Sequence, residues 1–142
     1  MPRVLVVDDD PWIAWMIADD LSERGYEVTT ARNGAEALKR LEAERPHAII
    51  LDLMMPGING WDFVERYQQR TGGRPIPIVV VSAARAVPRS FEHKGVRQFL
   101  PKPFDLEQLA RSVAEAVAAS AAPHLIAAAQ APGATESNAL TG

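Results

Sequence analysis

Polar side chains that could bind a metal ion and a phosphoryl group stand at the ends of four short apolar segments. They are Asp8, Asp9 and Asp10 after RVLVV, Asp52 after HAIIL, Ser82 after PIVVV, and Lys102 after QFLP. If the four segments are neighbouring parallel strands, these groups meet at one edge of a sheet, where open α/β sheets usually hold their ligands. The sequence therefore predicts a site for a divalent cation and a phosphoryl group at that edge.

The acidic residues suit Mg²⁺, a hard cation that takes oxygen ligands and keeps several waters, so that two carboxylates plus substrate oxygens suffice. Asp9 and Asp52 could supply those carboxylates. An acidic cluster after a strand can equally cap the next helix, so the residues from Asp8 to Asp10 are weak evidence by themselves. Asp52 strengthens the metal interpretation, because carboxylates at neighbouring strand ends repel one another and a cation offsets that repulsion.

Asp52 fits three roles: metal ligand, helix cap or nucleophile. A carboxylate that attacks phosphorus forms an acyl phosphate, and this step needs positive charge on the transferring oxygens. Lys102 could supply that charge, although a lone loop lysine is more often only solvated. Its place after an apolar strand and before Pro103 favours the site and makes their peptide bond a candidate for the cis form. Ser82 could cap a helix or donate a hydrogen bond to a phosphoryl oxygen.

Short β-branched runs alternate with amphipathic stretches, which predicts an α/β fold with a parallel sheet covered by helices on both faces. The expected strands are residues 3–8, 27–31, 47–52, 76–82 and 98–100. The expected helices run from Pro11 to a stop at Gly25, over 34–44, from Gly60 to the turn at 71–73, over 88–94, and from the cap Asp105 to about Ala119. On the first helix, Trp12 and Trp15 are expected to face outward.

The composition fits one compact domain over residues 1–119, followed by an Ala-rich flexible tail or linker stub over 120–142. The chain has no cysteine, and no apolar run is long enough for a signal peptide or a membrane span. We therefore expect a cytoplasmic protein without a membrane anchor. A net charge of −3 without a basic block makes direct nucleic-acid binding by this chain unexpected.

The motifs VVDDD, LDLMMPGINGWDF, VVVSAA and FLPKPF, in this order and spacing, resemble the receiver domain of two-component response regulators over residues 2–119. The resemblance implies a flavodoxin-like (βα)₅ fold with a doubly wound, five-stranded parallel sheet in the order 2-1-3-4-5. It further implies that a histidine kinase or a histidine phosphotransfer protein phosphorylates Asp52. The domain would then change its contacts with a downstream protein effector.

The same resemblance implies roles for the other site residues. Asp9 would bind Mg²⁺ directly and Asp8 through water, with Asp52 and the backbone carbonyl of Met54 as further ligands. Ser82 would be the switch hydroxyl and Lys102 the contact to the phosphoryl group. Phe99 stands where the family carries an aromatic residue that turns inward on activation, and a plain core phenylalanine is the other interpretation.

Some features depart from the family pattern. Asp10 adds a third carboxylate near the expected metal site. The span from Ser82 to Lys102 is slightly shorter than usual and contains Pro88, so the fourth helix should be short or irregular. Since that helix contributes to a common dimer face, we expect a mainly monomeric protein. The chain is expected to be either a stand-alone receiver or the excised N-terminal receiver of a longer regulator.

The sequence is compatible with three classes of function. The first is a signalling domain, not an enzyme in the usual sense, that catalyses its own phosphorylation and dephosphorylation at Asp52. The second is a Mg²⁺-dependent phosphohydrolase that works through an aspartyl phosphate. It is disfavoured because such enzymes usually carry the nucleophile after the first strand, whereas Asp52 follows the third. The third, a phosphate-independent binding module, is disfavoured because every expected site residue is present.

Overall fold

The computed structural model describes residues 1–53, 62–63, 66–67, 69, 76–82 and 96–130, with residues 121–130 as helical backbone only. Five strands form one parallel sheet in the order β2-β1-β3-β4-β5. The strands are β1 (Arg3–Val7), β2 (Glu27–Ala31), β3 (Ala48–Leu51), β4 (Ile78–Ser82) and β5 (Val96–Pro101). This topology confirms the predicted flavodoxin-like arrangement, and the strand ends lie close to their predicted places.

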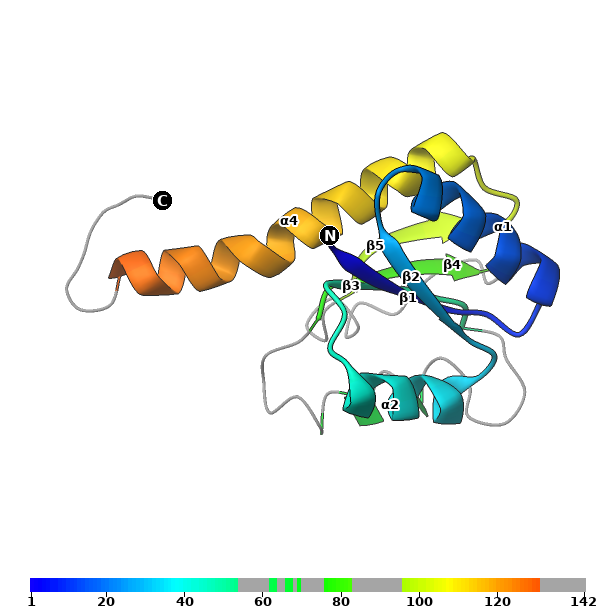
Figure 1. Cartoon of the computed structure of the whole chain (residues 1–142), viewed down its shortest axis with the longest axis horizontal. Coiled ribbons are helices and arrows are strands. Elements are labelled where there is room, and N and C mark those ends of the chain that lie inside the picture. The colour runs from blue at the N-terminus through cyan, green and yellow to red at the C-terminus, as the bar shows by residue number, and fades with distance from the viewer. Residues whose placement is uncertain (54–61, 64–65, 68, 70–75, 83–95, 131–142) are drawn as a thin grey trace.

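Helices cover both faces of the sheet (Figure 1). Those with described bounds are α1 (Pro11–Glu23), α2 (Gly34–Ala43) and α4 (Leu106–Gln130). Residues 62–63, 66–67 and 69 are also helical, within the segment where the third helix was predicted. The short helix expected over 88–94 lies outside the described residues. None of the helices in the described part of the chain combines the length and the apolar character that a membrane span requires.

The sheet separates two hydrophobic cores, because successive side chains of a strand point to opposite faces. On one face, Leu5, Val7, Ile49, Leu51, Ile78 and Val80 pack with residues of α2 and with Phe63 and Tyr67. On the other face, Val4, Val6, Ile50, Val79 and Val81 pack with residues of α1 and α4. The central strands are thus buried on both faces, which accounts for their unbroken apolar runs. Within these central strands, polar residues therefore lie at the ends.

The first helix is fixed at both ends by local interactions. Asp10 is its N-cap, and one carboxylate oxygen of Asp10 accepts hydrogen bonds from the backbone N–H groups of Trp12 and Ile13. At the other end, Gly25 has a φ of 101°, a conformation that glycine adopts without a steric penalty. The N–H groups of Gly25 and Tyr26 donate to the Ser22 and Leu21 carbonyls, the pattern of a Schellman motif. As predicted, α1 stops at this glycine.

The last helix is longer than predicted. We expected it to end near Ala119, but α4 continues to Gln130 and extends past the sheet (Figure 1). Residues 118–119, 121–122 and 127–129 are alanines, the residue type with the highest helix propensity. That preference outweighs the hydrogen bond lost at Pro123, and the next strong stop signal is Pro132 with Gly133. The first part of the predicted flexible tail is therefore helical, while residues 131–142 lie outside the described part.

A buried hydroxyl in one of the two cores yields a prediction about stability. The Tyr67 side chain is 1% exposed and stacks on Phe63, yet its hydroxyl has no hydrogen-bond partner among the described residues. Because a buried unsatisfied polar group costs free energy, Tyr67→Phe should raise the free energy of unfolding by about 1 kcal/mol in urea denaturation. Tyr26→Phe, at a half-buried position, is the control and should change it little. Destabilisation by Tyr67→Phe would contradict this account.

Candidate functional site

The carboxylates of Asp8 and Asp52 stand side by side where β1 and β3 end. The two strands pair through Val7 and Leu51, so the next residue of each strand is one of these aspartates. The Asp52 N–H donates to the Val7 carbonyl at 2.9 Å, and the Asp8 N–H donates to the Ala31 carbonyl of β2 at 3.0 Å. Both aspartates are almost fully buried, with exposures of 3% for Asp8 and 4% for Asp52. Backbone pairing thus continues past the strand ends and fixes where the two carboxylates lie.

Asp9 completes a group of carboxylates that fits a hard cation. One carboxylate oxygen from each of Asp8, Asp9 and Asp52 lies within 4.8 Å of the others, and Asp9 is exposed to solvent. Oxygen ligands in a cluster with an open side suit Mg²⁺, which keeps part of its water shell. With Lys102, three carboxylates and one ammonium give a formal charge of −2, which a divalent cation balances. The residues present therefore fit the predicted ion.

Lys102 brings positive charge to the same place from β5. Its Nζ lies 3.1 Å from Oδ2 of Asp8 and 3.3 Å from Oδ2 of Asp52. The Lys102 backbone N–H donates to the Ser82 carbonyl at 3.0 Å, which joins the ends of β4 and β5. The Lys102–Pro103 peptide bond is cis, as the sequence predicted. The pairing with Asp8 was not predicted, although the need of buried carboxylates for a counter-charge was a signal for it.

Burial and charge pairing act on the pKa values in opposite directions. Burial dominates at Asp8 and raises the pKa of its carboxyl, although the Asp10 backbone N–H, at 2.9 Å, and Lys102 both favour the ionised form. At Lys102, burial is the largest single effect and lowers the pKa. Asp8 and Asp52 together outweigh it, so the pKa of Lys102 is raised overall. The ammonium is therefore held charged, while the ionised form of Asp8 is costly until a cation binds.

Asp10 does not join the carboxylate group. We expected a third carboxylate near the metal at this position, but the described cluster contains Asp8, Asp9 and Asp52. The Asp10 side chain instead caps α1, at 2.9 Å from the Trp12 nitrogen and 3.3 Å from the Ile13 nitrogen. The helix-cap interpretation of the acidic triplet is thus correct for Asp10 alone, because the side chain of the residue just before a helix can reach its free N–H groups.

The remaining predicted residues lie around this group or outside the described part. Ser82 is fully buried at the carboxyl end of β4, and β4 lies between β3 and β5. Phe99 is partly buried on β5, level with Val80, and packs against the core that contains residues of α2. Met54, whose carbonyl was the fourth expected ligand, lies outside the described residues. The structure thus brings together Asp8, Asp9, Asp52 and Lys102.

Comparison with known proteins extends this description. A family model described as the response regulator receiver domain matches residues 4–114. The response regulator MprA of Mycobacterium ulcerans is 39% identical over 109 residues, which are 75% of this chain and 46% of that protein. MprA of Mycobacterium avium is also 39% identical, with 47% of its length covered. The chain thus spans about half the length of the curated relatives it matches.

Solved structures share the fold. The chemotaxis protein CheY4 of Vibrio cholerae matches with a TM-score of 0.73 and 32% identity, over 82% of this chain and 98% of that chain. The response regulator TrrA of Thermotoga maritima matches with a TM-score of 0.71 and 31% identity, over 82% of this chain and 99% of that chain. That TrrA structure is in complex with Mg²⁺-BeF.

The raised pKa of Asp8 predicts how stability depends on pH without Mg²⁺. The folded chain holds this proton to a higher pH than the unfolded chain, whose value is near 3.8. The contribution of Asp8 to the free energy of unfolding is therefore fully present below that value and is lost as pH rises through the folded pKa. Asp8→Asn cannot ionise, so at pH 7 without Mg²⁺ it should melt a few degrees above the wild type.

The control for this melting experiment is Asp19→Asn, which removes an exposed carboxylate from α1 and should leave the melting temperature unchanged. Saturating Mg²⁺ should raise the melting temperature of the wild type and of Asp19→Asn more than that of Asp8→Asn, because binding to the folded state stabilises it. An Asp8→Asn protein that melts below the wild type without Mg²⁺ would show that the Lys102 pair outweighs the cost of burial.

Proposed function

The chain belongs to the response regulator receiver domain family, and we propose that it accepts a phosphoryl group on Asp52 and thereby changes a surface that binds a protein partner. The donor is a histidine kinase or a histidine phosphotransfer protein of a two-component system. The observation that carries the proposal is the buried Asp52 carboxylate, 3.3 Å from the Lys102 ammonium and clustered with Asp8 and Asp9. A cytoplasmic location agrees with this role.

The chemistry at Asp52 is a displacement at phosphorus. A carboxylate oxygen forms a bond to phosphorus while the bond between phosphorus and the donor nitrogen breaks, and the electron pair of that bond stays on the nitrogen. Lys102 lies on one side of the acceptor and offsets negative charge on the transferring oxygens. When Mg²⁺ is bound to Asp8, Asp9 and Asp52, with the Met54 carbonyl as a further ligand, it supplies charge neutralisation and orients those oxygens. The same groups then support hydrolysis of the acyl phosphate.

Phosphorylation changes the balance of charge at Asp52, and we assign the response to Ser82 and Phe99. Ser82 is the last residue of the buried strand β4 and would donate its hydroxyl hydrogen to a phosphoryl oxygen. Phe99 is level with Val80 of that strand and would turn further into the space left by the movement of Ser82. Such a pair is a bistable element that links phosphate chemistry to the outer face near β4 and β5.

Phosphorylation can be tested with acetyl phosphate as a small donor. With Mg²⁺ present, we expect the wild-type chain to gain one phosphoryl group, seen by mass spectrometry and as a shift on a phosphate-affinity gel. Asp52→Asn should lose this signal, because an amide does not attack phosphorus, and removal of Mg²⁺ with a chelator should lower it at least about tenfold. Asp19→Asn is the control and should be labelled like the wild type. Equal labelling of Asp52→Asn would refute the assignment.

The sequence between β4 and β5 supports a proposal about the oligomeric state. The span from Ser82 to Lys102 is short for the family and contains Pro88, which disfavours a regular helix there. We therefore propose a mainly monomeric protein that does not use the common dimer face of the family. Light scattering should give the mass of one chain before and after treatment with acetyl phosphate and Mg²⁺. A dimer that appears only after phosphorylation would contradict this.

The phosphohydrolase alternative makes a different prediction for the same protein. Asp52 follows β3, not β1, and no observation on the described residues favours turnover of an external substrate. Repeated hydrolysis of a general phosphate ester by the wild type, lost in Asp52→Asn, would support that alternative instead of the signalling role.

A further inference from the structure

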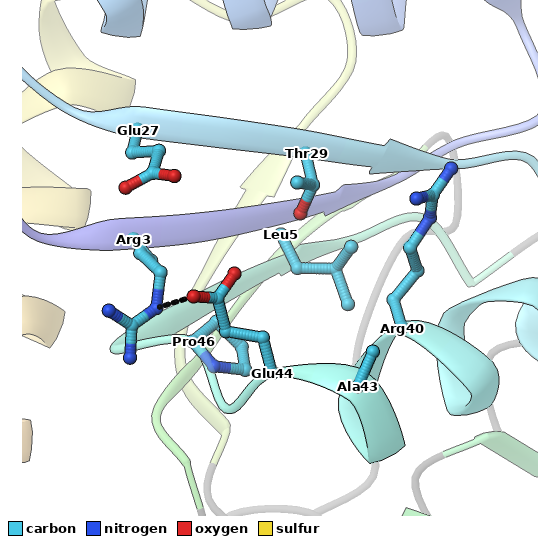
Figure 2. Close-up of a pocket in the computed structure, with 8 residues that line it drawn as sticks. All are labelled: Arg3, Leu5, Glu27, Thr29, Arg40, Ala43, Glu44 and Pro46. Atoms are coloured by element: carbon cyan, nitrogen blue, oxygen red, sulfur yellow. Dashed lines mark ion pairs between the residues drawn. The ribbon is translucent and has the colours of Figure 1, made fainter.

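A cleft between α1 and the carboxyl end of β2 lies beside the acidic site but takes no part in the proposed phosphotransfer. Its volume is about 410 Å³, within the range of about 300–1,000 Å³ that is usual for small-ligand pockets. The part of its wall formed by Pro11, Ala14, Ala18 and Ala31 is apolar. A second pocket, drawn in Figure 2, is only about 90 Å³ in volume and is too small for such a ligand.

Trp15 gives this cleft an aromatic wall. The Trp15 side chain lines the cleft and is 56% exposed. It stacks on Trp12, with ring centroids 5.3 Å apart and an angle of 27° between the ring planes. This stacking covers part of the Trp15 ring, and the exposed remainder of the side chain lines the cleft. A large exposed aromatic group suits stacking with a planar ring of a ligand.

Two guanidinium groups give the cleft positive charge. Arg32 and Arg40 both line it and are exposed, and among the described residues neither side chain takes part in a hydrogen bond or an ion pair. Figure 2 shows the Arg40 side chain reaching from α2 toward β2, with its guanidinium beside the carboxyl end of the strand. In the same view Arg3 is paired with Glu44 at 3.4 Å, so that arginine is already neutralised.

Each of the two acidic residues that line the cleft already has an ion-pair or hydrogen-bond partner. The Asp8 carboxylate is paired with Lys102 at 3.1 Å. One carboxylate oxygen of Glu36 accepts a hydrogen bond from the Arg32 backbone N–H at 2.6 Å, in the first turn of α2. The backbone N–H orients the Glu36 carboxylate without neutralising its charge, whereas Arg32 and Arg40 are cations without an ion-pair partner among the described residues. Two such guanidinium groups suit a dianionic phosphate better than a singly charged carboxylate.

We propose that this cleft binds a small ligand that joins a planar aromatic ring to a phosphate, the chemical class of the nucleotides. The ring stacks on Trp15, and the phosphate is held by Arg32 and Arg40. The apolar wall formed by Pro11, Ala14, Ala18 and Ala31 receives the rest of the ring. This assignment does not rest on phosphorylation at Asp52, because the three side chains that hold the ligand lie outside the acidic site, although Asp8 borders both.

The proposal can be tested by calorimetric titration of the full chain with AMP, without added Mg²⁺. Adenosine lacks the phosphate and inorganic phosphate lacks the ring, so each should bind at least about tenfold more weakly than AMP. Arg40→Gln should weaken AMP binding at least about tenfold but leave adenosine binding unchanged, because it removes only a charge contact. Trp15→Ala should weaken the binding of both AMP and adenosine, because it removes the stacking surface.

The matched control is Lys39→Gln, which removes a neighbouring exposed positive charge of α2 that does not line the cleft. It should leave the affinity for AMP unchanged, and circular dichroism should show that all variants are folded. Three results would overturn the proposal: no binding of AMP at millimolar concentration, equal affinities for AMP and inorganic phosphate, or the same loss of affinity in Lys39→Gln as in Arg40→Gln.

Discussion

The Lys102 ammonium is the group on which the carboxyl edge of this sheet depends. It contacts Asp8 at 3.1 Å and Asp52 at 3.3 Å, and both carboxylates are almost completely buried. Two such charges without a partner would repel each other strongly in a region that water hardly reaches. Because Lys102 directly follows β5, and Asp8 and Asp52 directly follow β1 and β3, this ion pairing also joins the ends of three strands.

Much of the fold could be predicted from the sequence because its signals are local. Apolar runs bounded by polar residues located the five strands, and Gly25 located the end of α1 through its left-handed conformation. The end of α4 could not be predicted in the same way. Ser120 and Pro123 looked like the start of a tail, but the stretch is rich in alanine, and helix propensity summed over it outweighs one proline.

Those positions in the candidate site that the strand ends fix could be predicted from the sequence. The residues after β1 and β3 come together because the two strands are in register, so the ends of the two apolar runs suffice to place Asp8 beside Asp52. The hydrogen-bond and ion-pair partners of each side chain could not be inferred, since they depend on distances across the sheet. The Asp10 carboxylate accepts hydrogen bonds from N–H groups of α1, and the Lys102 ammonium pairs with Asp8 as well as with Asp52.

Asp8 borders both the acidic site and the cleft beside Trp15, and this shared wall has a thermodynamic consequence. If an occupant of the cleft alters the electric field at Asp8, it alters the affinity of the acidic site for its cation by some factor. Linkage then requires that the cation alter the affinity of the cleft by the same factor. Because Asp8 lines both the acidic site and the cleft, binding at either site thus changes the affinity of the other, without any movement of the backbone.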